Sequence, residues 1–202
     1  MMKRAFDITI ASVGLVLLSP LLIVVSLLIK LDSPGPALFR QERIGRKFRP
    51  FRIYKFRTMV QEAPGKGGMI TFGGDPRITR VGRVLRTTKI DELPQLLNIL
   101  RGEMSFVGPR PEVRPYVERF REDYAEILKV LPGITDLASL QYRHEAEILG
   151  CSENPEEEYV TRVLPEKIRL AKEYLRRSSM RFDVILIMRT LLSLWRRSSS
   201  IV

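Results

Sequence analysis

The sequence predicts a predominantly helical α+β protein with an apolar helix at its N-terminus. Three observations support this prediction. Residues 8–29 are uncharged, leucines recur at helical spacing over 93–100, and aromatic and basic residues alternate over 48–57 as in a short strand or hairpin. We therefore expect a membrane anchor at 1–31 and a membrane-associated domain at 32–202.

The uncharged run has the length of a membrane helix. Its 22 residues would measure about 33 Å as a straight helix, enough to cross a bilayer. A cleaved signal peptide would have a shorter apolar core followed by small residues. Here Lys30 follows the run instead, so the sequence favours a membrane helix.

Ser19 and Pro20 lie near the middle of this run. Proline removes a helical hydrogen bond, and serine can bond a backbone carbonyl and bend the helix. Basic residues flank the run on both sides, and the positive-inside rule places both flanks in the cytoplasm. We expect a re-entrant helix that breaks at Ser19-Pro20 and returns to the same face. A Pro-kinked spanning helix, with the soluble part in the cytoplasm, is the alternative.

Composition limits the partners and the chemistry. The formal net charge is +11 and the pI is about 10.1, so the partner should be anionic: nucleic acid, a lipid surface or a phosphorylated substrate. One cysteine, Cys151, excludes an internal disulfide and a multi-cysteine zinc site. One histidine, His144, excludes a multi-histidine metal centre. Hard-metal chemistry on carboxylates stays open.

Asp91 and Glu92 are adjacent carboxylates at a predicted helix start. Pro94 suits the first turn of a helix, and Gly102 is a natural stop. The positive end of the helix dipole stabilises anions at such a position. Arginines recur upstream at positions 77, 80, 83 and 86. This charge predicts that both carboxylates are ionised at pH 7. A charged helix start docked on a basic surface is the simpler interpretation.

Other stretches allow more than one interpretation. Arg110 lies between two prolines that stiffen its backbone, which suits phosphate binding or an ordinary rigid turn. The basic face of 48–57 could meet nucleic acid, lipid headgroups or a nucleotide, or could be a solvated strand pair. Residues 62–76 are rich in glycine but lack the P-loop pattern, so we expect a surface loop.

The C-terminal part is predicted to be helical. Residues 182–195 are apolar but too short to span a membrane, so they could lie in the interface, with Trp195 at headgroup depth, or form a core helix. Further helices are expected at Glu112–Leu131, Pro155–Val163 and Pro165–Arg177.

Eight short motifs follow one another between residues 3 and 136. They are Lys3-Arg4-Ala5-Phe6-Asp7, Ser19-Pro20, Pro34-Gly35-Pro36, Gln41-Glu42-Arg43-Ile44-Gly45, Lys55-Phe56-Arg57-Thr58-Met59, Asp91-Glu92-Leu93-Pro94-Gln95, Val107-Gly108-Pro109-Arg110-Pro111 and Pro132-Gly133-Ile134-Thr135. Together and in this order they resemble the bacterial sugar transferase family, the monotopic phosphoglycosyl transferases.

The resemblance implies a reaction and a location. Members transfer a sugar-1-phosphate from a UDP-sugar to a polyprenyl phosphate, usually undecaprenyl phosphate, and release UMP. They use Mg²⁺ and start glycoconjugate assembly on the cytoplasmic face of the bacterial inner membrane. Their Ser-Pro helix is a re-entrant hairpin, which agrees with the flanking charges here. Membrane lipids are then expected partners, nucleic acid is not, and a homodimer is left open.

The resemblance also implies roles for residues. Asp91 would be the nucleophile, would form a phosphosugar-aspartyl intermediate and would contact Mg²⁺. Glu92 would either position Asp91 or act as a base towards the acceptor. Phosphate or nucleotide binding would fall to Arg86, Arg110, Lys55 and Arg57. Residues 136–150 depart from the family's usual pattern, so no contact is assigned there.

Two alternatives belong to other functional classes. A membrane-tethered nucleic-acid-binding protein would show salt-dependent binding and would not need Asp91. A non-catalytic membrane scaffold would tolerate Asp91→Asn. The intact acidic pair, together with Arg86 and Arg110, favours the transferase.

Overall fold

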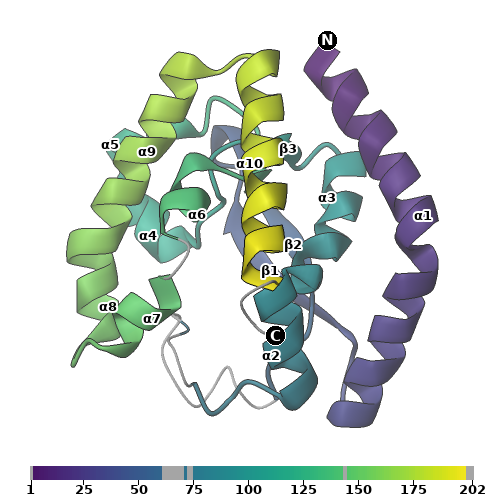
Figure 1. Ribbon diagram of the computed structural model, residues 1–202. Coiled ribbons are helices and arrows are strands. Elements are labelled where there is room, and N and C mark those ends of the chain that lie inside the picture. The colour runs from purple at the N-terminus through teal and green to yellow at the C-terminus, as the bar shows by residue number, and fades with distance from the viewer. Residues whose placement is uncertain (1, 61–70, 72–74, 143–144, 199–202) are drawn as a thin grey trace.

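A computed structural model of the chain describes residues 2–60, 71, 75–142 and 145–198. Helices dominate and small sheets accompany them, which confirms the predicted α+β class (Figure 1). In chain order the elements are α1 (Met2–Asp32), β1 (Leu38–Ile44), η1 (Arg46–Phe48), β2 (Pro50–Phe56), α2 (Arg80–Thr88), η3 (Ile90–Gln95), α3 (Leu96–Leu100), β3 (Ser105–Val107), α4 (Arg114–Arg119), α5 (Arg121–Ile127), β4 (Gly133–Thr135), α6 (Leu137–Gln141), α7 (Glu145–Gly150), α8 (Pro155–Glu158), η4 (Tyr159–Val163), α9 (Leu164–Arg177) and α10 (Met180–Ser198).

Helix α1 runs without interruption through Ser19 and Pro20. The predicted break is therefore wrong as an interruption of the helix, and the reason is local. Proline has no N–H for the carbonyl four residues earlier, which belongs to Val16. The Ser19 hydroxyl donates to that carbonyl instead, at 2.8 Å. The helix continues, and Figure 1 shows its axis bending between the two ends.

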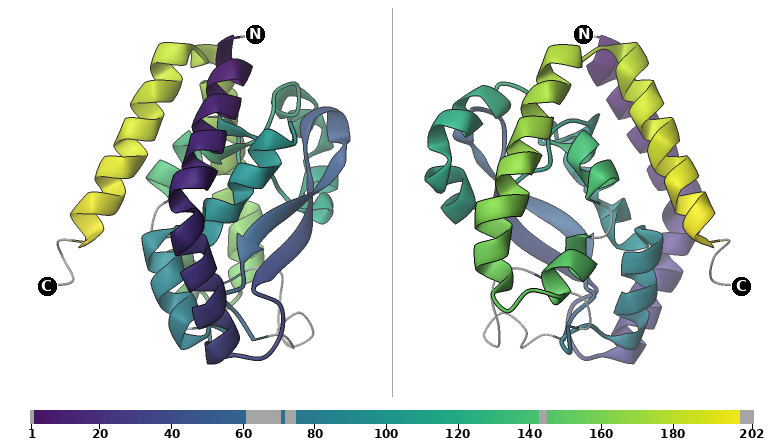
Figure 2. Two further views of the ribbon diagram at one scale, coloured as in Figure 1. Left: turned by 90° about the vertical axis from the view of Figure 1, so that its right-hand side faces the viewer. Right: turned by 60° about the vertical axis from the view of Figure 1, so that its left-hand side comes forward.

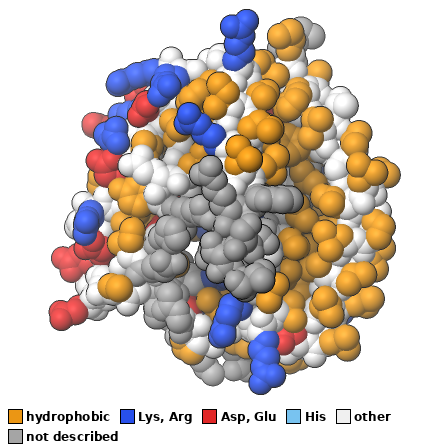
Figure 3. Space-filling view, viewed as in Figure 1, with side chains coloured by type: hydrophobic (Ala, Val, Ile, Leu, Met, Phe, Trp, Pro, Cys, Tyr) orange, Lys and Arg blue, Asp and Glu red, His pale blue; other side chains and the backbone are white. Residues whose placement is uncertain are grey.

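Most of α1 is exposed. An 18-residue stretch has a mean hydropathy of 2.7, and only 11% of it is buried inside the protein. By length and composition α1 can therefore cross a membrane, and its exposure distinguishes it from a core helix. Figure 3 shows hydrophobic side chains gathered along the side of the molecule where α1 runs.

Polar contacts fix the N-terminal end of α1 to the domain. Lys3 Nζ donates to the Val107 carbonyl at 2.8 Å and to the Tyr174 hydroxyl at 2.9 Å. It also forms a 2.6 Å ion pair with the buried Asp183 of α10. Arg4 donates to two carbonyls at the end of α3. This end of α1 is therefore held by β3, α3, α9 and α10 together.

The C-terminal end of α1 is fixed as firmly. The guanidinium of Arg57, a residue only 6% exposed, donates to the Ser33 carbonyl at 2.6 Å and to the Pro34 carbonyl at 2.8 Å. Asp32 accepts the backbone N–H of Val81 at 3.1 Å, which ties α1 to α2. Both ends of α1 therefore contact the same domain.

Residues 48–57, predicted as a short strand or hairpin, contain one strand, β2, and its hairpin partner is β1, which was not predicted. The two strands are antiparallel, with a register from Leu38↔Phe56 to Ile44↔Pro50. Figure 2 shows this hairpin across the molecule from α10. Its inner face contributes Ile53 to a core that also contains residues of α1 and α3. The hairpin therefore supports the membrane-helix side of the domain.

Strands β3 and β4 pair in parallel, and their backbones come unusually close at the end of β3. A Cβ on Gly133 would lie 2.1 Å from the Gly108 nitrogen and 2.5 Å from the Gly108 oxygen. No side chain fits at that distance, and the facing atoms are backbone. Two glycines are therefore needed where the turn that carries Arg110 leaves β3.

The C-terminal helices differ from the prediction in detail. The single helix expected at Glu112–Leu131 is wrong, because Phe120 has non-helical angles (φ −119°, ψ 42°) and separates α4 from α5. The two helices expected at 155–163 and 165–177 are found as α8, η4 and α9, which follow one another directly.

Over residues 182–195, helix α10 has one buried face and one exposed face. Leu186 is fully buried against the domain, as a core helix requires. The outer face is apolar yet exposed, and consists of Val184, Ile185, Met188, Leu191 and Leu192. The side chain of Trp195 lies outside the described residues. This apolar exposed face is typical of a helix that lies on a membrane surface.

We predict that Gly133→Ala lowers the free energy of unfolding by about 3 kcal/mol or more, since the new methyl group would meet backbone that cannot move aside. Gly14→Ala is the matched control, because a Cβ there meets only Leu96 Cδ1, at an ordinary 3.5 Å. Denaturant unfolding in detergent measures both. Equal stabilities of the two variants would contradict the close contact.

Candidate functional site

The acidic pair sits at a corner between two helices. Helix α2 is capped at its N-terminus by Thr79, whose hydroxyl accepts the N–H of Gly82 at 2.9 Å, and at its C-terminus by Lys89. The expected α-helical start at Asp91 is instead the 3-10 turn η3, and α3 follows it. Pro94 lies inside this turn, where its missing N–H breaks no bond of a longer helix. Asp91 and Glu92 are both buried, at 8% exposure.

Glu92 is held by two cations. Its Oε1 receives Lys55 Nζ from β2 at 2.9 Å and Arg110 Nη2 at 2.6 Å. Burial would raise the pKa of the Glu92 carboxyl, but the charges of Arg110 and Lys55 hold that pKa well below its usual range. The Glu92 charge in turn raises the pKa of Arg110. Glu92 is therefore an anion at neutral pH, and Lys55 and Arg110 neutralise its charge.

Asp91 has the opposite surroundings. Its Oδ1 is buried and has no hydrogen-bond partner within the described part of the chain. Burial raises the pKa of the Asp91 carboxyl, and the neighbouring Glu92 charge adds to this. Lys55, Lys89 and Arg86 act in the other direction. Asp91 therefore carries a buried oxygen that no described residue hydrogen-bonds.

Arg86 lies beside Asp91 as expected. Its Nε donates to the Thr58 hydroxyl at 2.8 Å, and burial lowers the pKa of its guanidinium while the Asp91 charge opposes this. Asp75, which is paired with Arg77 at 2.6 Å, also acts on Arg86 through its charge. Most of the predicted glycine-rich loop and all of His144 lie outside the described residues.

The turn that carries Arg110 is fixed on two sides. The Arg110 N–H donates to Asp136 Oδ2 at 3.1 Å, and the Asp136 Oδ1 caps α6. On the other side Arg43 Nη1 donates to the Pro111 carbonyl at 3.2 Å and forms an ion pair with Glu112 at 3.3 Å. The guanidinium of Arg110 is thereby directed at Glu92.

Sequence reasoning missed these supporting residues. Arg43 lies within one of the eight motifs, and Asp136 directly follows another, so their motifs did mark both positions as candidates. Their contacts join segments 68 and 26 residues apart, however, and no local pattern reports such contacts.

Of the predicted site residues, the structure brings together Asp91, Glu92, Arg86, Arg110 and Lys55. It places Arg57 elsewhere, because that guanidinium binds the C-terminal end of α1. Among the described residues there is no group of three or more His, Cys, Asp or Glu side chains that could hold a metal ion. A cation here would have one free carboxylate, Asp91, with the remaining ligands from phosphate oxygens and water.

Fold and site together define a class: a membrane-bound protein that gathers three partly buried cations and a carboxylate without a hydrogen-bond partner on one oxygen, a set suited to binding phosphate. The chain belongs to the bacterial sugar transferase family, whose sequence profile matches residues 1–197.

Curated relatives share the domain and carry related names. The chain is 39% identical over 194 residues to UDP-N-acetylgalactosamine-undecaprenyl-phosphate N-acetylgalactosaminephosphotransferase of Aeromonas hydrophila, covering 94% of this chain and 42% of that protein. It is 40% identical over 195 residues to UDP-glucose:undecaprenyl-phosphate glucose-1-phosphate transferase of Caulobacter vibrioides, covering 95% and 69%. The protein of the same name from Escherichia coli is 39% identical over 194 residues, covering 94% and 39%. The chain therefore spans less than half of the Aeromonas and Escherichia relatives.

Neutralising each of the two carboxylates should change the stability to a different extent. We predict that Glu92→Gln lowers the free energy of unfolding by about 3 kcal/mol, because Lys55 and Arg110 lose their common counter-charge. Asp91→Asn should change it by less than about 1 kcal/mol, since the ionised Asp91 is disfavoured by burial. Unfolding in detergent at pH 7 tests the pair.

The pH dependence follows from the same shifts. The pKa of Glu92 is lowered on folding, so its contribution is present above the ordinary glutamate pKa and is lost as the pH falls through the lowered value. The stability difference between wild type and Glu92→Gln should therefore shrink on acidification. A difference that is constant with pH would contradict the ion cluster.

Proposed function

We propose that this chain transfers a sugar-1-phosphate from a UDP-sugar to undecaprenyl phosphate and releases UMP, as an early membrane step of glycoconjugate synthesis. The observation that carries this proposal is the unpartnered buried oxygen of Asp91, beside a Glu92 charge that two cations already neutralise. A site that kept both carboxylates in salt bridges would have no free nucleophile.

The proposed reaction has two steps that share Asp91. First a carboxylate oxygen of Asp91 attacks the sugar-bearing phosphorus of the UDP-sugar, the phosphorus–oxygen bond to UMP breaks, and a phosphosugar-aspartyl intermediate forms. Then an oxygen of the acceptor phosphate attacks the same phosphorus, the bond to Asp91 breaks, and the free carboxylate returns. Each step forms and breaks one phosphorus–oxygen bond.

The cations around Asp91 suit the charge that moves in these steps. Arg86 and Arg110 would bind the diphosphate and the departing UMP, and Lys55 would add its charge from the Glu92 side. Asp91 is the residue that would hold Mg²⁺, which would neutralise phosphate charge when bound.

Glu92 is better suited to holding cations than to taking a proton. A general base works best when its pKa lies near the working pH, whereas the pKa of Glu92 is held well below the usual range. We therefore assign Glu92 the positioning of Lys55 and Arg110. A nucleic-acid-binding protein would present its cations on the surface, but Lys55 and Arg110 turn inwards to Glu92.

The contacts of α1 support the proposal that the protein is monotopic and lies on the cytoplasmic face of the bacterial inner membrane. Both ends of α1 bind one domain, so a helix that delivered its N-terminus across the bilayer would have to give up the contacts of Lys3 and Arg4. The exposed apolar faces of α1 and α10 would enter the same leaflet. Residues 1–31 thus act as the re-entrant anchor and 32–202 as the catalytic domain.

The reaction is tested by the nucleotide released. Protein in detergent receives Mg²⁺, undecaprenyl phosphate and a panel of UDP-sugars that includes UDP-glucose and UDP-N-acetylgalactosamine. We expect UMP from wild type, and at least about 1,000-fold less from Asp91→Asn, which lacks the nucleophile. Release of UDP would mean ordinary glycosyl transfer and overturn the mechanism. No release across a broad panel would favour a scaffold.

The topology is tested by cysteine labelling in sealed membrane vesicles. The exposed native Cys151 reports the side of the domain, and Met2→Cys in a Cys151→Ser background reports the start of α1. A membrane-impermeant maleimide should label both from the same side. Labelling from opposite sides would show a spanning helix.

We further expect Pro20→Ala to straighten α1 and move a share of the Met2→Cys label to the other side, because alanine restores the missing N–H. Ser26→Ala is the matched control, since the Ser26 hydroxyl bonds the Leu22 carbonyl within the same helix. If Pro20→Ala leaves both positions on one side, the proline does not set the topology.

A further inference from the structure

Lys89 forms the corner between α2 and the acidic pair. Its backbone is left-handed, with φ 60° and ψ 13°, a conformation that is uncommon for residues other than glycine and asparagine. Its carbonyl accepts the N–H of Glu92 at 3.1 Å, and its own N–H faces the Arg86 carbonyl at 3.4 Å. Glycine or asparagine would make this corner with less strain, so the lysine side chain calls for an explanation.

The ammonium of Lys89 is free while its neighbours are engaged. Lys55 and Arg110 bind Glu92, and Arg86 binds Thr58. Lys89 is exposed, and its ammonium makes no hydrogen bond or ion pair with any residue that the structure describes. Its charge nevertheless acts on both carboxyls of the pair. A free cation therefore stands at the outer side of a buried site.

Exposed apolar side chains occur on α2 and α3, the helices before and after this corner. Val84 on α2 is 60% exposed, and Leu97 on α3 is 36% exposed. Figure 1 shows α2 and α3 between α1 and α10, the two helices with exposed apolar faces. Contact with apolar side chains adds no binding energy for a soluble nucleotide sugar. A phosphate attached to a hydrocarbon chain can bind both the cation and the apolar surface.

We propose that Lys89, Val84 and Leu97 form the acceptor subsite, in which the ammonium binds the phosphate of the polyprenyl phosphate and the two apolar side chains contact its first isoprene units. This inference rests on the proposed transfer reaction. It assigns the cations of the site to two different substrates. Arg86 and Arg110 would serve the donor from inside, and Lys89 would serve the acceptor from the membrane side.

The two half-reactions separate this inference from the proposed function. Rapid mixing with a UDP-sugar and Mg²⁺, without acceptor, measures the first turnover of UMP. Steady-state assays at varied undecaprenyl phosphate measure the second step. If wild type releases no UMP under either condition, the proposed function fails before the acceptor subsite is at issue.

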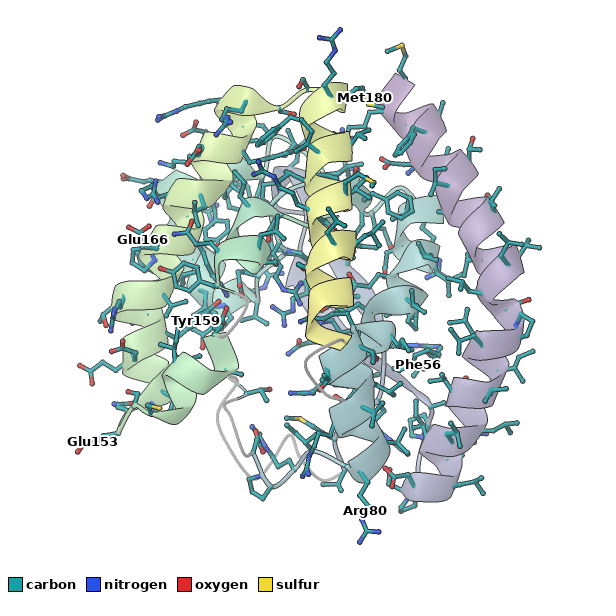
Figure 4. The ribbon with its side chains drawn as sticks, in the orientation of Figure 1. Phe56, Arg80, Glu153, Tyr159, Glu166 and Met180 are labelled. Atoms are coloured by element: carbon teal, nitrogen blue, oxygen red, sulfur yellow. The ribbon has the colours of Figure 1, made fainter. Side chains whose placement is uncertain are left out.

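The diagnostic variant is Lys89→Asn, because asparagine tolerates the left-handed backbone and lacks the charge. We expect KM for undecaprenyl phosphate to rise about tenfold, with one UMP still released per enzyme in the first turnover. Lys89→Arg should restore most of the affinity. The control is Arg80→Gln at the far end of α2, where Figure 4 shows the side chain pointing away from the domain.

The apolar part has its own test. Val84→Ser should raise KM for undecaprenyl phosphate but leave KM for a short water-soluble prenyl phosphate unchanged, whereas Lys89→Asn should raise both. A slower first turnover in Lys89→Asn would assign the lysine to the donor and overturn the proposal. An unchanged KM would do the same. If the change in KM needs added phosphatidylglycerol in the micelles, Lys89 binds lipid headgroups instead of the acceptor.

Discussion

The ion cluster on Glu92 is the constraint on which the site depends. One carboxylate oxygen binds Lys55 from β2 and Arg110 from the turn after β3, so a single negative charge joins three segments that are distant in sequence. Buried charges are tolerated only when their partners are held close. Three features hold the partners of Glu92 in place: the β1–β2 hairpin, the contact between Gly108 and Gly133, and the hydrogen bond from the Arg110 backbone to Asp136. With Glu92 saturated, the adjacent Asp91 keeps a free oxygen.

The same strand end links the site to the membrane helix. Lys55 binds Glu92, and two residues later Arg57 binds the carbonyls that end α1. The segment from Lys55 to Arg57 therefore fixes the distance between the anchor and the acidic pair. A lipid-linked acceptor needs such a fixed depth, because its phosphate cannot leave the headgroup region while its chain stays in the bilayer.

Much of the site could be predicted from the sequence, but only as a set of residues. The ordered motifs, and the family resemblance that they carry, brought Asp91, Glu92, Arg86 and Arg110 into one hypothesis, and the structure does gather them. Arg57 came from the same motif as Lys55, yet it binds the end of α1, because β2 ends at Phe56 and Arg57 lies beyond the strand, outside its alternation of faces. The contacts of Asp136 and Arg43 cross the fold, where helix and strand periodicities carry no information.

The membrane helix shows the same division. Its length, apolarity and basic flanks could be predicted from residues 8–29 and their neighbours, since these are local properties of the chain. The sequence also located the disturbance at Ser19 and Pro20, but not that the serine hydroxyl would occupy the carbonyl that the proline leaves free and so keep the helix continuous. By itself, then, the sequence determined the elements and the kinds of chemistry available. Only the tertiary structure decided which carboxylate is neutralised and which is free, because pairing and burial depend on distances between segments that no local pattern encodes.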